Sequence, residues 1–200
     1  QPAPDELDGD EARAMIDDIG RFGSPVILFS GGEPTMRPDL MELIAHAKSA
    51  GLRAVISTNG TLITQPMAEK LAEKGLSYVG VSLDGLQPVH DKFRGVAGAF
   101  QQALEGMRNC LAVGVKVGLR FTLNKQNVAD LPGIFDLIER EGIGRVCFYH
   151  LVYTGRGDKL REATLSNQQT RETVDLILDR TKALHDSGRA VEVLTVDNHA

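Results

Sequence analysis

The sequence predicts an α/β fold in which short apolar strands alternate with amphipathic helices. Single helices separate six apolar runs of strand length, an order that implies right-handed parallel crossovers. Six parallel strands form either an open doubly wound sheet or a barrel. No linker or low-complexity segment interrupts the 200 residues, so residues 1–200 are expected to form one domain.

The individual elements follow from apolar periodicity and from residues that start or end helices. Pro38 near a first turn and Gly51 just past the last turn bracket one helix, and Asp8 can cap another. A longer connection is expected after residue 83. The predicted strands are 26–29, 53–57, 78–83, 115–123, 145–152 and 191–196, and the predicted helices are 7–22, 38–50, 66–74, 98–113, 131–141 and 166–185.

Two predicted strands have one apolar and one polar side, which favours the barrel. Along residues 115–124 one side is wholly apolar, whereas the other includes Arg120 and Asn124. Residues 78–84 alternate in the same way. A strand buried in a doubly wound sheet is apolar on both sides. We therefore expect a partial (β/α)6 TIM-like barrel of parallel strands whose polar inner side holds a ligand.

Composition argues against several classes of function. A net charge of -5 disfavours a nucleic-acid surface, because phosphate binding needs a clustered basic face. No apolar run approaches the roughly 18 residues that span a bilayer, and residues 1–6 are unlike a signal peptide. Cys110 and Cys147 are too few for a disulfide framework, and we expect them to be reduced. These features predict a cytoplasmic protein.

Polar motifs recur at the carboxyl ends of the predicted strands. The most informative is GGEP at 31–34, directly after the apolar run 26–29. STNG at 57–60 and SLDG at 82–85 end the next two strands, and His150 ends a later one. Each motif alone could be a simple turn, since Asn-Gly and Asp-Gly favour turns. Their recurrence predicts a binding face, because the strand ends of a parallel barrel share one rim.

The chemistry of this rim suits a zwitterionic, nucleoside-like ligand. Its glycines allow close approach to the backbone, and Glu33 offers a carboxylate to a cationic group. The rim also carries hydroxyl, amide and arginine side chains, which can bind the polar groups of such a ligand. A phosphate would favour a glycine-rich helix start without an adjacent glutamate.

The motifs resemble those of the radical S-adenosylmethionine (SAM) superfamily. The resemblance rests on GGEP, STNG, SLDG and the sequence HDKFR at 90–94, and it covers nearly the whole chain. Segments 120–123, 147–157 and 194–199 are most similar to the branch that acts in haem d1 biosynthesis. Haem-forming decarboxylases and peptide-modifying SPASM relatives are near this branch. The resemblance implies a partial barrel, with SAM and a [4Fe–4S] cluster as cofactors.

The resemblance also implies contacts to the methionyl part of SAM. Gly31 and Gly32 would offer backbone groups to its ammonium, with Glu33 as the electrostatic partner and Pro34 completing the motif. Ser82 and Arg94 match the positions that hold its carboxylate, where a guanidinium can pair bidentately. The alternative for Arg94 is a solvated surface arginine.

Other positions are implied more loosely. Asn59 and Asp84 are candidates for the ribose, and Leu151 for packing against the adenine. Arg120 and Asn124, on the polar side of their strand, are candidates for cofactor or substrate.

For the whole enzyme the resemblance implies a tetrapyrrole substrate, didecarboxysiroheme, in which two propionate side chains are replaced by oxo groups. An electron donor such as flavodoxin or ferredoxin is also implied. Candidates for binding the acidic substrate are His150, Tyr153, Arg156 and His199. His150 could equally be a satisfied histidine at a strand end. Neither a membrane nor a nucleic acid is expected as a partner.

The sequence departs from the family in its cysteines. The cluster of the family is bound by a CxxxCxxC motif after the first strand, whereas Cys110 falls in a predicted helix and Cys147 in a predicted strand. We therefore predict no metal ligand and no catalytic residue in this chain. We expect an enzyme core truncated at both ends, with its first strand missing, that is inactive by itself. The alternatives are a haem-forming or peptide-modifying enzyme, and a non-enzymatic module that binds SAM or a tetrapyrrole.

Overall fold

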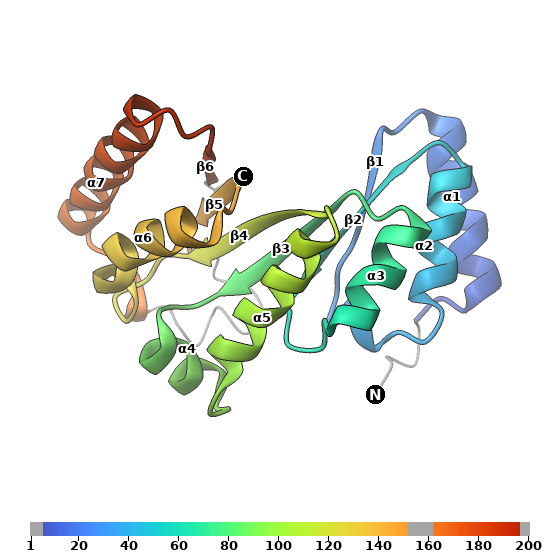
Figure 1. Ribbon diagram of the computed structural model, residues 1–200, viewed down its shortest axis with the longest axis horizontal. Coiled ribbons are helices and arrows are strands. Elements are labelled where there is room, and N and C mark those ends of the chain that lie inside the picture. The colour runs from blue at the N-terminus through green and yellow to red at the C-terminus, as the bar shows by residue number, and fades with distance from the viewer. Residues whose placement is uncertain (1–5, 152–161, 197–200) are drawn as a thin grey trace.

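Six parallel strands form one sheet whose spatial order is the order of the chain, β1-β2-β3-β4-β5-β6 (Figure 1). The computed structural model describes residues 6–151 and 162–196. Each strand pairs in parallel with the next one along the sequence. This confirms the predicted α/β fold. The strands are β1 Val26–Phe29, β2 Arg53–Thr58, β3 Tyr78–Leu83, β4 Lys116–Thr122, β5 Arg145–Tyr149 and β6 Glu192–Val196.

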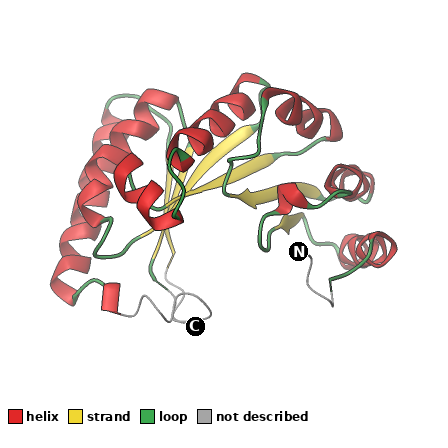
Figure 2. Ribbon diagram, turned by 90° about the horizontal axis from the view of Figure 1, so that it is seen from below, coloured by secondary structure: helices red, strands yellow, loops and turns green. Residues whose placement is uncertain are grey.

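The helices connect successive strands and lie around the outside of the fanned strands (Figure 2). Asp8 caps the first helix as predicted, since its side chain accepts from the amides of Asp10 and Glu11. Gly75 ends the third helix with a φ of 92°, a left-handed conformation that favours glycine. The helices are α1 Gly9–Phe22, α2 Leu40–Ser49, α3 Gln65–Lys74, α4 Gln87–Arg94, α5 Ala99–Ala112, α6 Leu131–Glu141 and α7 Asn167–Asp186, with 3-10 turns η1 Pro34–Met36 and η2 Val128–Asp130.

The longer connection expected after β3 contains a helix, α4, that the sequence did not predict. Its eight residues are too few to show a clear apolar period, and His90 is the one buried residue among them. Asp91 on α4 accepts from the amides of Gly98 and Phe100, each at 2.8 Å. The carboxylate of Asp91 thereby caps the start of α5 and fixes α4 against it.

Other boundaries moved by one to three residues. The strand predicted to run from residue 145 to 152 ends at Tyr149, and the one predicted from 115 begins at Lys116. β1, β3 and α6 have the predicted bounds. Such shifts are usual where an element frays into a loop.

The two sides of the strands differ as predicted. On the side toward the helices, Leu119 and Phe121 of β4 are fully buried, and Phe121 packs edge-on against Phe148 of β5. The opposite side, called here the inner face, carries Gly118 and the partly buried Arg120. The apolar core therefore lies between the sheet and its helices, and the inner face is left for polar side chains.

Near the amino ends of the strands, the inner face is filled by side chains. Tyr78 lies across Gly118, where an added Cβ would be 1.9 Å from the tyrosine oxygen. The guanidinium carbon of Arg145 is 5.2 Å from the centre of the Tyr78 ring, and Arg145 pairs with Glu192 at 2.5 Å. We call Tyr78, Arg145 and Glu192 the inner-face base. The more open part of the inner face therefore lies toward the carboxyl ends of the strands.

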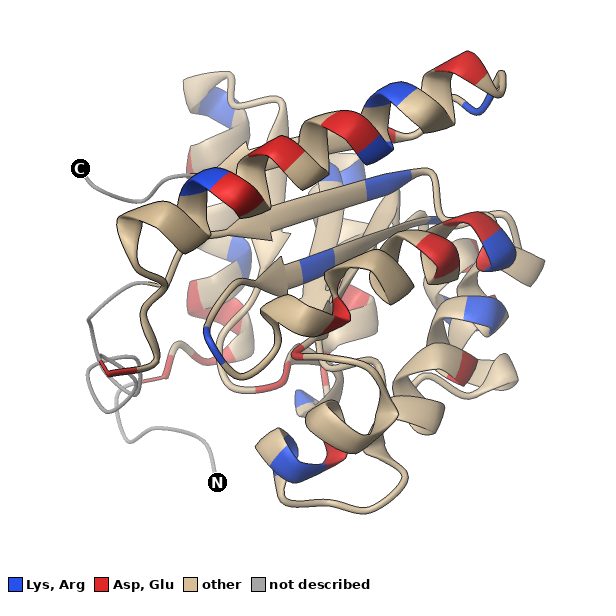
Figure 3. Cartoon of the chain, turned by 90° about the vertical axis from the view of Figure 1, so that its left-hand side faces the viewer, with Lys and Arg blue, Asp and Glu red and all other residues tan. Residues whose placement is uncertain are grey.

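The outer helices carry charges of both signs. Acidic and basic residues are interspersed along α7, the long helix at the top of Figure 3. Among residues 6–151 and 162–196, every helix is too short or too polar to cross a membrane.

Candidate functional site

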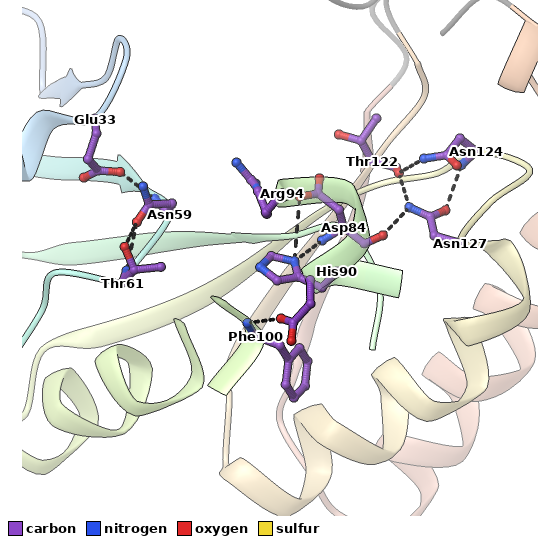
Figure 4. A network of polar contacts seen from close by, with 11 residues as sticks. Glu33, Asn59, Thr61, Asp84, His90, Arg94, Phe100, Thr122, Asn124 and Asn127 are labelled. Carbon is purple, nitrogen blue, oxygen red and sulfur yellow. Dashed lines mark hydrogen bonds and ion pairs between the residues drawn. The ribbon is translucent and has the colours of Figure 1, made fainter. Parts of the chain in front are cut away.

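The loops that follow β1, β2, β3 and β4 bring polar side chains to one edge of the sheet. Figure 4 shows two separate groups of contacting side chains there, one around Glu33 and Asn59, the other around Asp84, His90 and Asn127. Parallel strands end on the same side, so their loops meet although they are far apart in the sequence.

Glu33 joins the loop after β1 to the loop after β2. Its Oε1 accepts from the hydroxyls of Thr35 at 2.5 Å and Thr58 at 2.6 Å, and from the Thr35 amide at 3.1 Å. Its Oε2 accepts from the amide of Asn59 at 2.8 Å. All four partners are donors, which suits a carboxylate because it can only accept. Oε2 has a second lone pair for a further donor, such as an ammonium group.

The two glycines before Glu33 leave the backbone accessible. A Cβ added at Gly31 or Gly32 would meet no atom within 4 Å, and Gly31 has a φ of 125°. Pro34, by contrast, is buried and begins η1. A ligand can therefore reach the main chain at Gly31 and Gly32 while Pro34 anchors the loop below.

Asn59 makes a local turn. Its Oδ1 accepts from the amide of Thr61 at 2.8 Å and from the Thr61 hydroxyl at 2.7 Å. These bonds fix the loop after β2, in which the backbone amide of Asn59 donates to Glu33. A ribose contact by Asn59 stays a prediction.

Asp84, just after β3, contacts Arg94 and His90 of α4. Nε of Arg94 lies 2.6 Å from Oδ2 of Asp84, an ion pair without hydrogen-bond geometry. The amide of Asp84 donates to Nδ1 of His90 at 3.0 Å. The side chain of Arg94 is 33% exposed and that of Asp84 is 14% exposed, so the guanidinium stays accessible beside a largely covered carboxylate.

His90 is buried in its neutral form. Because Nδ1 accepts the Asp84 amide, the ring proton is assigned to Nε2. Burial lowers the pKa of His90, and the nearby Arg94 charge lowers it further, against the opposing effect of Asp84. The ring packs edge-on against Phe100 at 6.1 Å between centroids. His90 therefore ties α4 to the end of β3.

The protein is expected to lose stability below pH 6.5 because His90 is buried neutral. The unfolded chain takes up this proton more readily than the folded chain, so the free energy of unfolding falls as pH drops from 6.5 toward the lowered pKa. The slope from one such group cannot exceed about 1.4 kcal/mol per pH unit. Urea unfolding at pH 7.5, 6.5 and 5.5 measures it.

His90→Gln should remove this part of the slope, whereas His46→Gln on the outer helix α2 should retain it. A His90→Gln protein with the unaltered slope would contradict the assignment. Asp91 also stabilises the fold through its two amide bonds, which lower its pKa, but that contribution is lost only below about pH 3.8 and lies outside the measured range.

Asn127 joins the ends of β3 and β4, and sequence reasoning missed it. Its Nδ2 donates to the carbonyl oxygens of Thr122 at 2.8 Å and Asp84 at 3.0 Å, and its Oδ1 accepts from the amide of Asn124 at 2.9 Å. Its side chain is almost fully buried. The available signal was a second asparagine three residues after Asn124, just past the end of β4, a pattern typical of side-chain-stabilised turns.

Asn124 itself is buried in this turn. Its Oδ1 accepts from the amide of Gln126 at 2.8 Å, and its Nδ2 donates to the carbonyl of Thr122 at 3.3 Å. The structure thus gives Asn124 a local role, and its contact with a cofactor or substrate stays a prediction.

The inner face contributes the remaining predicted residues of the middle strands. Ser82 and Arg120 are register partners on β3 and β4. The guanidinium carbon of Arg120 lies 4.7 Å from the centre of the Tyr149 ring, a cation–π contact. Burial is the main cause that raises the pKa of Tyr149 to about 12, so this ring stays neutral.

Two predicted residues follow β5 directly. The amide of His150 donates to the carbonyl of Val196 at 3.2 Å, which extends the pairing of β5 with β6, and Leu151 is buried. Their contacts with substrate and adenine stay predictions. Tyr153, Arg156 and His199 lie outside the described residues.

No group of three or more His, Cys, Asp or Glu side chains within the described ranges could hold a metal ion. Cys110 is buried in α5, where desolvation raises the pKa of its thiol to about 11, and Cys147 is buried in β5. A thiolate ligand needs a low pKa and neighbouring ligands. The cysteines of this chain therefore do not fit an iron–sulfur cluster.

The sequence pattern of the Radical SAM superfamily matches residues 1–138. Among curated proteins, the Fe-coproporphyrin III synthase of Methanosarcina barkeri is 64% identical over 194 residues, which cover 97% of this chain and 49% of the relative. The pre-heme d1 synthase of Dinoroseobacter shibae is 42% identical over 198 residues, which cover 98% of this chain and 49% of that relative. The chain spans about half the length of the curated relatives it matches.

A solved structure has the same fold. The crystal structure of Streptococcus suis SuiB bound to S-adenosylmethionine superposes with a TM-score of 0.81 at 17% sequence identity, and the match covers 100% of this chain and 46% of that one. At this identity the likeness shows the fold alone.

Proposed function

The chain belongs to the radical SAM superfamily, and on this premise we propose that its strand-end loops are the SAM site of an enzyme that acts on an iron tetrapyrrole. Members of the family use SAM and a [4Fe–4S] cluster. The observation that carries the substrate class is the 64% identity with a protein named Fe-coproporphyrin III synthase. We accordingly propose Fe-coproporphyrin III as the product.

The residues at the strand ends fit SAM. The backbone of Gly31 and Gly32 is open to a ligand, and Oε2 of Glu33 can accept a further hydrogen bond from the methionyl ammonium. Arg94, which pairs with Asp84 just after β3, offers a partly exposed guanidinium to the carboxylate, and Ser82 on β3 is the second candidate for it. These residues would bind and orient SAM, which with the reduced cluster supplies one-electron radical chemistry.

A second candidate is the replacement of two propionate side chains of didecarboxysiroheme by oxo groups, on the way to haem d1. The 42% identity with a pre-heme d1 synthase supports it. Both candidates share an acidic iron tetrapyrrole as the substrate, and both need an electron donor such as flavodoxin or ferredoxin.

The test uses the full-length protein after reconstitution with iron and sulfide, incubated without oxygen with SAM, dithionite and didecarboxysiroheme. Mass spectrometry and absorbance of the extracted pigment should identify Fe-coproporphyrin III. A product with two oxo groups in place of propionates would favour the second candidate. Cleavage of SAM with an unchanged tetrapyrrole would contradict both, and unreconstituted protein serves as the control.

A further inference from the structure

Arg120 is a cation on the inner face that no carboxylate neutralises among the described residues. Its partner there is the ring of Tyr149, at 4.7 Å from guanidinium carbon to ring centre. The other two arginines near the inner face differ, because Arg145 pairs with Glu192 at 2.5 Å and Arg94 pairs with Asp84 at 2.6 Å. Of these three arginines, Arg120 is therefore the one whose charge has no carboxylate partner among the described residues.

The fold fixes this side chain in place. An added Cβ at Gly80 would lie 2.9 Å from Cδ of Arg120, so the stem of the arginine crosses β3 where that strand has no side chain. Tyr149 then supports the guanidinium from β5. A partly buried guanidinium keeps its charge, and without a counter-ion it favours binding an anion.

The surroundings of Arg120 are amphipathic. In the register of the sheet, Arg120 is flanked by Ser82 on β3 and Cys147 on β5, and Cys147 faces Leu194 on β6. Leu194 is 39% exposed although it is apolar. The inner face thus offers a hydroxyl, a cation and an apolar surface at one level, which matches a ligand with a flat apolar body and carboxylates at its edge.

We propose that Arg120 binds a carboxylate of the tetrapyrrole substrate and thereby selects for tetrapyrroles with free acidic side chains. This inference rests on the proposed function. The methionyl carboxylate of SAM is the other possible source of a carboxylate. The substrate is favoured because the guanidinium of Arg120 lies over the ring of Tyr149 on β5, and β5 is the neighbour of β6, which carries the exposed Leu194. Glu33 and Arg94, the candidates for the methionyl part of SAM, lie instead on the loop after β1 and at the end of α4.

The test titrates full-length protein, with SAM present, with ferric coproporphyrin III and with its tetramethyl ester in the same detergent, followed by the Soret band. The wild type should bind the free acid at least 10-fold more tightly. Arg120→Gln should weaken the binding of the free acid by about 10- to 100-fold, the range for a hydrogen bond to a charged group, and should leave the binding of the ester unchanged. Arg120→Lys should retain part of the preference for the free acid over the ester.

Controls separate the alternatives. Arg21→Gln, which removes a charge from the exposed side of α1, should bind both pigments as the wild type does. Equal weakening of acid and ester in Arg120→Gln would show a structural role and overturn the proposal. A lower affinity for SAM in that variant, measured by calorimetry without pigment, would place Arg120 in the cofactor site and also overturn it. Wild-type protein that binds neither pigment would overturn the proposed function itself.

Discussion

Replacing Glu33 with glutamine should lower the free energy of unfolding by about 2–3 kcal/mol and weaken SAM binding. The carboxylate accepts four hydrogen bonds, from Thr35 twice, from Thr58 and from Asn59. A glutamine amide has a donor group where the glutamate has an acceptor, so at least one of these donors loses its partner. A hydrogen bond to a charged group contributes about 1.5–3 kcal/mol. Urea unfolding at pH 7.5 measures the loss.

Two further variants separate stability from cofactor binding. Glu42→Gln, on the exposed side of α2, should change neither quantity. Thr58→Val removes one donor to Glu33 but keeps the carboxylate. If Glu33 binds the ammonium of SAM, Glu33→Gln should weaken SAM binding more than Thr58→Val does, measured by calorimetry at a temperature where both variants are folded. Equal weakening would mean that Glu33 acts only by holding the loops.

The sequence predicted those features of the fold that depend on neighbouring residues. The capping of α1 by Asp8 and the glycine stop at Gly75 follow from local backbone chemistry. The alternation along β4 predicted which side of the strand faces the helices, because side chains of a strand point alternately to its two sides. The strand-end motifs could likewise be placed on one rim, because parallel strands share a direction.

The bonds within the site could not be predicted, because they join residues far apart in the sequence. Asn127 and Asp84 are separated by 43 positions, and Glu33 and Thr58 by 25. Glycine and glutamate in a GGEP motif suggest an open ligand site, yet the carboxylate also binds its own chain. Likewise, alternation put Arg120 on the polar side of β4, but the absence of a carboxylate partner among the described residues depends on the register of β5 and β6.

Replacing Asn127 with alanine should lower the free energy of unfolding by about 3–4 kcal/mol. The substitution leaves the Asn124 amide and the Thr122 and Asp84 carbonyls without this partner, at a position where the Asn127 side chain is almost fully buried. Each buried backbone group left without a partner costs about 1–3 kcal/mol, and Asn124 still donates weakly to Thr122. Urea unfolding measures the total, and hydrogen exchange of the Asn124 amide reports the local opening.

Asn109→Ala is the matched control, because Asn109 donates one hydrogen bond, to the carbonyl of Ile63 at 2.8 Å, from a partly buried position on α5. It should cost about 1 kcal/mol. A loss in Asn127→Ala no larger than this would contradict the bridging role. Because Asn127 holds the carbonyl of Asp84, whose carboxylate pairs with Arg94, the variant should also weaken SAM binding, and Asn109→Ala should not. A loss of both stability and SAM binding in Asn127→Ala would show that the turn after β4 supports the loop after β3, from which Arg94 reaches the site.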